Sequence, residues 1–293
     1  MDRATKVTWL GFFWNIALAV IKIIAGYLGK SQALIADGFH SFSDLIGDVA
    51  VLTGLKISRR PRDKTHNYGH GKFETLSALI ISLLLIFVSI GILWAAVTNI
   101  LKAMHGAELH EPKRFSIIII LFAIGIKEWL FHYTNRIGKE ENSQSLIMNA
   151  LHHRTDSLSS VAVLIGLSGA VILGGNWRIL DPITALLVGT LILFLSFKTV
   201  IRSTNEMMEA ALSIERQQYI LSIAAEVPGV INPHNLKTRR IGKDVAIDMH
   251  IKVTPSLSIV EAHNIATEVE NRLKDYFEEN CFISIHVEPF EGH

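Results

Sequence analysis

The sequence predicts an α-helical membrane protein in which six transmembrane helices are followed by a small α+β domain. Hydrophobic residues make up 49% of the 293 residues, and the mean hydropathy of +0.35 is high for a soluble protein. The charged fraction of 19% is too high for a chain that lies wholly within a membrane. Together these values indicate a membrane domain, residues 1–204, joined to a soluble domain, residues 205–293.

Six stretches of the chain are apolar over about 20 residues, which is the length that crosses a bilayer as a helix. They are residues 7–28, 33–57, 76–101, 115–132, 146–173 and 179–201. Lys127 and Glu128 interrupt the fourth stretch near its end. Only "GKSQ" separates the first two stretches and only "GGNWR" the last two, so each pair should be antiparallel neighbours.

Basic residues near the ends of these stretches predict the orientation, because cytoplasmic loops carry an excess of lysine and arginine. One side has Arg3, Lys6, Lys56, Arg59, Arg60, Arg62, Lys64, Lys72, Arg136, Lys139 and Arg202. The other side has Lys30, Lys102, Lys113, Arg114 and Arg178. We therefore expect both termini in the cytoplasm and the chain in a cell membrane, such as the bacterial inner membrane.

Helical and strand patterns alternate after about residue 205. "SIERQQYILSIAAEV" and "SLSIVEAHNIATEVENRLKDYF" have the period of amphipathic helices. "VAIDMHIKV" and "FISIHVEPF" alternate apolar and polar residues, as half-buried strands do. With "HNLKTRRI" as a further strand, this domain should contain two helices and three strands.

Polar residues inside the second and fifth apolar stretches carry the main functional information. His40 precedes Asp44 by one helical turn, and His152 precedes Asp156 by one turn. A charged residue at the middle of a bilayer costs about 2.5–3.5 kcal/mol on insertion scales. Two helices with these pairs could offset the cost by facing each other around a cation. Two imidazoles and two carboxylates suit a tetrahedral divalent ion such as zinc. The alternative is an interhelical hydrogen-bonded pair that only holds the helices together.

Asp37 and Asp48 lie on the same face of the second helix as Asp44. Neither has a matching partner on the fifth helix, so we do not expect them to be ligands. We expect instead that they line a wet path to the metal.

The chain resembles the cation diffusion facilitator family of metal/proton antiporters. The resemblance rests on the paired His-x3-Asp motifs, on "HNYGHGKFE" after the second stretch and on the histidine-bearing tail, and it covers essentially the whole chain. It implies a transporter rather than an enzyme, a homodimer in the lipid bilayer, and a ferredoxin-like (metallochaperone-like) cytoplasmic domain. It places the transport site at His40, Asp44, His152 and Asp156. Some iron- or zinc-exporting relatives have aspartate where His40 stands, so the histidine favours Zn(II) as the exported ion.

The donor set also suggests how transport could be driven. Metal binds imidazole only when it is neutral and carboxylate only when it is ionised, so binding releases protons. Alternating exposure of the site could then exchange metal ions for protons. Export of iron(II), cadmium or cobalt is an alternative within the same class. A non-transporting metal receptor is another alternative, in which the tail senses metal and the helices only anchor the chain.

The loop after the second stretch contains a second candidate metal site. His66 and His70 could chelate one ion, and the resemblance adds Asp63 to them; a solvated polar loop is the alternative. The resemblance also implies an ion pair near the dimer axis between Lys72 and Glu209.

The tail carries a third cluster of candidate ligands. Exposed histidines on a sheet are usually ordinary surface residues. The resemblance instead implies a cytoplasmic zinc site that ties two protomers together. Its residues are His234, His250, His263, His286 and Glu288.

Composition argues against other classes of protein. The formal net charge of +1 shows no footprint for nucleic acid. Cys281 is the single cysteine, which excludes an intrachain disulfide and a cysteine-built zinc site. A membrane metallohydrolase would need a motif such as His-Glu-x2-His, and the sequence has none.

Overall fold

The computed structural model describes residues 3–43, 45, 63–141, 144–242, 244–277 and 281–291. It divides into two compact units. We call Met1–Val49 with Ile80–Thr199 the helical unit, and Ala50–Leu79 with Val200–His293 the C-terminal unit.

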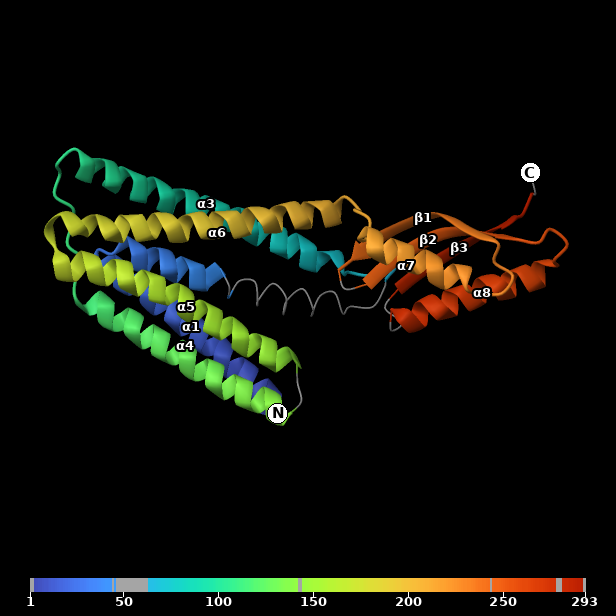
Figure 1. Ribbon diagram of the computed structural model, residues 1–293, viewed down its shortest axis with the longest axis horizontal. Helices are drawn as coiled ribbons and strands as arrows, with labels where there is room; N and C mark the ends of the chain where they lie inside the picture. The colour runs from blue at the N-terminus through green and yellow to red at the C-terminus, as the bar shows by residue number, and fades with distance from the viewer. Residues whose placement is uncertain are drawn as a thin grey trace. The chain divides into compact units, whose positions relative to one another are not determined.

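Long helices make up the helical unit (Figure 1). They are α1 (Arg3–Gly29), α3 (Lys72–Met104), α4 (Phe115–Glu140), α5 (Gln144–Leu173) and α6 (Leu180–Met207), of which α3 and α6 also contribute residues to the C-terminal unit. The 3-10 helix η1 (Gly175–Ile179) precedes α6, and residues 32–43 are helical. The helix α4 packs against both α1 and α5.

Five helices in the described part of the chain are long and apolar enough to cross a membrane. They cover Lys6–Gly29, Lys72–Met104, Phe115–Glu140, Asn149–Leu173 and Gly175–Met207. These correspond to all the expected spans except the second. Of that second span, residues 33–57, the structure describes 33–43 and 45, and the remainder lies outside the described residues. The prediction of a helical membrane domain is confirmed.

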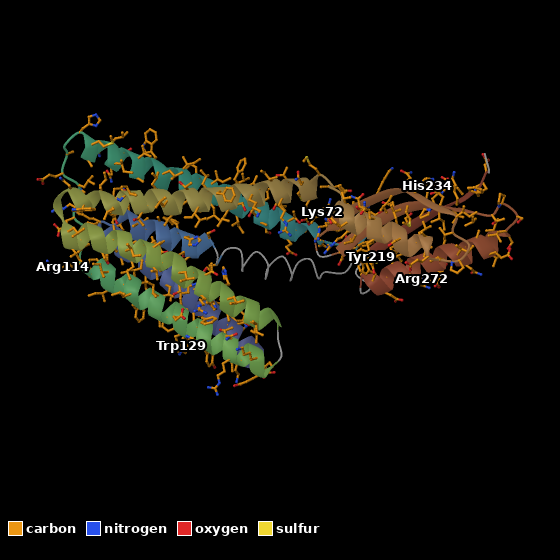
Figure 2. All side chains as sticks on the ribbon, in the orientation of Figure 1. Lys72, Arg114, Trp129, Tyr219, His234 and Arg272 are labelled. Carbon is orange, nitrogen blue, oxygen red and sulfur yellow. The ribbon has the colours of Figure 1, made fainter. Side chains whose placement is uncertain are left out.

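The helical unit has apolar side chains outside and charged side chains inside. Phe87 and Trp94 are each 76% exposed, and Trp129 on α4 (Figure 2) is 47% exposed. Lys22 and Lys127 are each only 1% exposed. Such an arrangement is unfavourable in water, but it suits a lipid environment in which polar groups must find partners within the protein.

Gly38 allows the segment 32–43 to pack closely against α1. A Cβ atom at Gly38 would lie 2.7 Å from Ile23 Cγ1 and 2.9 Å from Ile23 N. A larger residue would push the two helices apart. The close approach is what brings Lys22 of α1 within reach of Asp37.

Besides the ends of α3 and α6, the C-terminal unit contains a three-stranded sheet and two helices in the described residues. The elements are α7 (Ile214–Ala225), β1 (Asn232–Ile241), β2 (Asp244–Val253), α8 (Ile259–Tyr276) and β3 (Cys281–Pro289). The order is β1-β2-β3, with β1 antiparallel and β3 parallel to β2. The predicted α+β domain is confirmed.

Alternation along β2 separates the core of this unit from its polar face. Ile247, Met249 and Ile251 are buried with residues of α7 and α8, including Val269. The intervening residues, among them His250, therefore point to the opposite face of the sheet. A capping box between Ser258 and Glu261 begins α8.

Candidate metal-transport site

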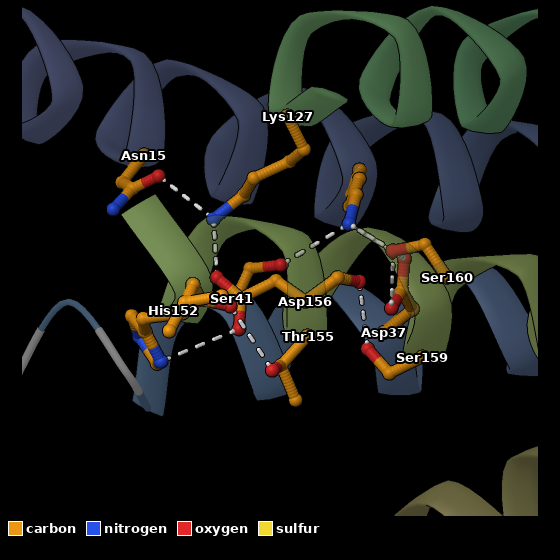
Figure 3. A network of polar contacts seen from close by, with 11 residues as sticks. Asn15, Asp37, Ser41, Lys127, His152, Thr155, Asp156, Ser159 and Ser160 are labelled. Atoms are coloured by element: carbon orange, nitrogen blue, oxygen red, sulfur yellow. Dashed lines mark hydrogen bonds and ion pairs between the residues drawn. The ribbon is translucent and has the colours of Figure 1, made fainter. Parts of the chain in front are cut away.

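A buried lysine pairs with one of the predicted transport ligands. Lys127 Nζ on α4 lies 2.6 Å from Asp156 Oδ2 on α5, and it donates to Asn15 Oδ1 on α1 at 2.8 Å (Figure 3). Asp156 is 6% exposed. Three helices therefore meet at one buried charge pair.

A second buried ion pair, between Lys22 of α1 and Asp37 of the segment 32–43, contacts α5 at Ser160, one helical turn from Asp156. Lys22 Nζ is 2.7 Å from Asp37 Oδ2, and it also donates to Ser41 Oγ at 3.1 Å and to Ser160 Oγ at 3.0 Å. Ser160 Oγ in turn lies 3.1 Å from both carboxylate oxygens of Asp37 (Figure 3). The expectation that Asp37 lines a wet path is wrong, because its side chain is 1% exposed and pairs with a lysine. Asp48 lies outside the described residues.

Three of the four predicted transport ligands are described. His152 Nδ1 lies 3.8 Å from Asp156 Oδ1, as the one-turn spacing on α5 requires. His40 is partly buried on the segment 32–43. That segment contacts α5 through the Asp37–Ser160 hydrogen bonds, one turn from Asp156. Asp44 lies outside the described residues.

Sequence reasoning noted Lys127 only as an interruption of the fourth stretch, and it missed Lys22 and the neighbouring His153. Lys22 and Lys127 each interrupt an apolar stretch, and a charge within a membrane helix calls for a partner in the protein. His153 is 1% exposed, and neither of its ring nitrogens has a hydrogen-bond partner among the described residues. The His-x3-Asp spacing pointed to His152, and nothing in the sequence indicated that His153 beside it would be buried.

The loop site brings its three predicted residues together within the C-terminal unit. One ligand atom from each of Asp63, His66 and His70 lies within 4.8 Å of the others. His66 Nδ1 and His70 Nε2 lie 3.3 Å and 3.5 Å from the Asp63 carboxylate. Hydrogen bonds, above all from the Thr65 side chain, lower the pKa of Asp63 well below its ordinary value. The carboxylate is therefore ionised and available to a cation at neutral pH.

Two glycines dock this loop against the turn between β1 and β2. A Cβ atom at Gly71 would lie 2.3 Å from Ile241 O, and one at Gly242 would lie 2.6 Å from Gly71 O. Gly242 also has a φ of +65°, which favours glycine. In addition, the ring of Tyr68 lies 5.3 Å from that of Phe282 on β3.

Lys72 and Glu209, the predicted ion pair, are in contact in the structure. Lys72 Nζ lies 2.5 Å from Glu209 Oε1, and Arg239 Nε lies 3.1 Å from Glu209 Oε2. The hydrogen bond from Lys72, followed by the charges of Lys72 and Arg239, lowers the pKa of Glu209. Lys72 begins α3 (Figure 2).

Strand register aligns three of the predicted tail ligands across the sheet. His234 of β1 pairs with His250 of β2, which pairs with His286 of β3. The register of β1 shifts just after His234, where Asn235 has a φ of +47°. The three imidazoles therefore lie in a row on the polar face (His234 is labelled in Figure 2).

Glu288 completes the close group of the tail. Its carboxylate lies 2.8 Å from His250 Nδ1 and 3.3 Å from His234 Nε2. The hydrogen bond from His250 is the main cause that lowers the pKa of Glu288. His286 Nε2 is further away, at 4.0 Å from Glu288 Oε1. His263 is exposed on α8, and the close group among the described residues does not include it.

Comparison with known proteins identifies the family of the chain. A model of the cation efflux transmembrane domain matches residues 8–208, and a model of the cytoplasmic domain of cation efflux proteins matches residues 212–290. The chain is 35% identical to "Metal tolerance protein C1" of Arabidopsis thaliana, over 98% of this chain and 63% of that protein, which is less than two thirds of its length.

Two bacterial relatives match over nearly their full length. The chain is 31% identical to "Manganese efflux system protein MneP" of Bacillus subtilis, over 97% of this chain and 96% of that protein. It is 28% identical to "Magnetosome protein MamB" of Magnetospirillum gryphiswaldense, over 98% and 95%. The chain therefore belongs to the cation efflux, or cation diffusion facilitator, family of divalent metal transporters.

Proposed function

We propose that the chain exports Zn(II) from the cytoplasm in exchange for protons. The observation that carries the proposal is the buried Asp156 carboxylate with the His152 imidazole 3.8 Å away, inside a helix that is long enough to span a membrane. With His40 and Asp44, these residues would supply two nitrogen and two oxygen ligands. That set suits tetrahedral zinc better than ions that prefer oxygen alone.

Proton exchange follows from the same ligands. Zinc binds the neutral imidazole and the ionised carboxylate, so each loading event releases protons and each protonation favours unloading. A site buried among helices can face either side of the membrane in turn. The excess of basic residues on one side supports cytoplasmic termini, and export would then move zinc away from the cytoplasm.

The chain would work as a homodimer with further metal sites in its C-terminal unit. The close group of His234, His250 and Glu288 supports a cytoplasmic zinc site, to which His286 and His263 would add. The group of Asp63, His66 and His70 supports a loop site. Zn(II) in the tail would be structural, whereas at Asp156 it is the transported ion.

Manganese export is the second candidate, because one relative is a manganese efflux system protein. Uptake into proteoliposomes that contain the full chain separates the two. Radioactive zinc is offered with increasing manganese, and manganese with increasing zinc. The proposal expects zinc to be transported and to displace manganese at equal concentration. Manganese uptake that equal zinc does not reduce would contradict it.

A further inference from the structure

Lys127 is held between two acceptors of different strength. Its ammonium lies 2.6 Å from the Asp156 carboxylate and 2.8 Å from the neutral amide oxygen of Asn15. The side chains of Lys127 and Asp156 are 2% and 8% exposed. A buried ammonium must keep a partner, and here one partner is also a proposed metal ligand.

A divalent ion on Asp156 would meet the ammonium at the same carboxylate. Two positive charges a few ångströms apart repel strongly where water is excluded. Metal and Lys127 therefore compete for the negative charge of Asp156, although the metal would approach Oδ1 beside His152 while the lysine contacts Oδ2. Asn15 offers the lysine a place to remain hydrogen bonded when the carboxylate is taken.

We infer that Lys127 is a tethered competitor of the transported metal. It occupies Asp156 when the site is empty, and the incoming ion displaces it toward Asn15. Because Asp156 is a ligand only under the proposed function, this role rests on that function. The proposed exchange is one of hydrogen-bond partners and involves no proton transfer by the lysine.

The competitor has two consequences for transport. It weakens metal binding, because part of the binding free energy breaks the Lys127–Asp156 pair. It also neutralises Asp156 in the empty carrier. The site then holds no unpaired carboxylate while it changes from facing one side of the membrane to facing the other. Removal of the charge should therefore lower KM and lower the maximal rate together, a combination that a general loss of stability does not produce.

The second ion pair supplies a matched control. The side chains of Lys22 and Asp37 are each 1% exposed, and Lys22 Nζ lies 2.7 Å from Asp37 Oδ2. Asp37 is not a proposed ligand. The variant Lys22→Met therefore removes a buried ion pair of the same helical unit without freeing the carboxylate that binds metal.

Zinc uptake into proteoliposomes tests the role, with KM and maximal rate measured for the wild type, Lys127→Met, Lys127→Arg and Lys22→Met. We expect Lys127→Met to lower KM about tenfold and to lower the maximal rate. Lys127→Arg keeps the charge and should keep KM at or above the wild-type value. Lys22→Met should leave KM unchanged, whatever it does to the unfolding temperature.

Gel filtration and thermal unfolding show which variants are folded. If Lys127→Met is not folded, Lys127→Gln replaces it, because the amide can still donate to Asn15 and Asp156. A KM that is unchanged or raised in the folded neutral variant would overturn the competitor role. Asp156→Asn separates the two proposals. Normal uptake in Asp156→Asn contradicts the proposed function, whereas lost uptake there with an unchanged KM in Lys127→Met contradicts only the role of Lys127.

Discussion

Lys72 and Glu209 are 137 residues apart in the sequence, yet Lys72 Nζ donates to Glu209 Oε1 at 2.5 Å. The contact joins the start of α3 to the residues just after α6 within the C-terminal unit. Thr75 Oγ1 adds a second link by donating to Glu206 Oε1 at 2.7 Å. Arg239 on β1 also contacts the Glu209 carboxylate. This one charged group therefore joins the residues just after α6 to the start of α3 and to the sheet.

Glu209→Gln should reduce stability only modestly. The two side chains of the ion pair are 30% and 49% exposed, and pairs at such positions contribute about 0.2–1 kcal/mol. Thermal unfolding in detergent at low salt should show a small decrease, and the decrease should shrink at high salt, where the charges are screened. A large loss at both salt concentrations would contradict this assignment.

Low pH should remove the difference in thermal stability between the wild type and Glu209→Gln. The pKa of Glu209 is lowered below its ordinary value of 4.5, mainly by the hydrogen bond from Lys72. The stabilisation is therefore complete above that ordinary value and disappears as the pH falls through the lowered pKa. Unfolding curves measured between neutral pH and the lowest pH that the protein tolerates should converge. A stability difference between the two proteins that increases as the pH falls would contradict a lowered pKa for Glu209.

Asp156→Asn should reduce zinc uptake to the level of empty vesicles. The amide removes the charge of a proposed ligand but keeps an oxygen that can accept from Lys127. The variant should therefore fold more readily than Asp156→Ala, which leaves the buried lysine without its charged partner at a cost of about 3–5 kcal/mol. Ser160→Ala, one turn away on α5, is the control and should retain uptake. Substantial uptake by folded Asp156→Asn would remove Asp156 from the site.

Much of the fold was predictable because hydrophobic periodicity reports which face of an element is buried. The alternation of Ile247, Met249 and Ile251 located β2, and apolar length located the five spans found in the described residues. Periodicity does not say which elements become neighbours. The sequence alone could therefore not place Lys127 at Asp156, nor Lys22 at Asp37, and it led to the wrong expectation for Asp37.

The alignment of the tail histidines was beyond sequence reasoning for a related reason. Register decides which residues of adjacent strands lie opposite each other, and a shift by one residue would turn His234 to the other face. The irregularity after His234 is a local backbone feature at Asn235 that no apolar pattern reports. The Lys72–Glu209 pair came only from the family resemblance.

His40→Asp should relax metal selectivity. A carboxylate in place of an imidazole makes the donor set richer in oxygen, which favours manganese and iron(II) relative to zinc. The measurement is the ratio of zinc to manganese uptake in proteoliposomes, with wild type and variant prepared in parallel. An unchanged ratio, with uptake intact, would argue that His40 is not a ligand.

The close group of the tail should bind zinc and stabilise the protein. Zinc added to the metal-free full chain should raise its unfolding temperature, because a ligand that binds only the folded state shifts the equilibrium toward it. His250→Ala with Glu288→Ala should remove most of this rise, and a chelator should reverse it in the wild type. His105→Ala changes an exposed histidine in the turn just after α3 and should leave the rise intact. A rise as large in the double variant as in the wild type would show that these side chains do not bind zinc and are ordinary surface residues.

Dependence of zinc flux on a proton gradient tests the central claim of metal/proton exchange most directly. Zinc uptake is measured into proton-tight vesicles with an acidic interior and into vesicles without a gradient, at the same external pH. Protons that leave as zinc enters should make uptake faster with the acidic interior, and a proton ionophore should abolish the gain. Internal alkalinisation should accompany uptake in the wild type and be absent in Asp156→Asn. Zinc flux that is the same with and without the gradient would contradict antiport, even if all the proposed ligands bind the metal.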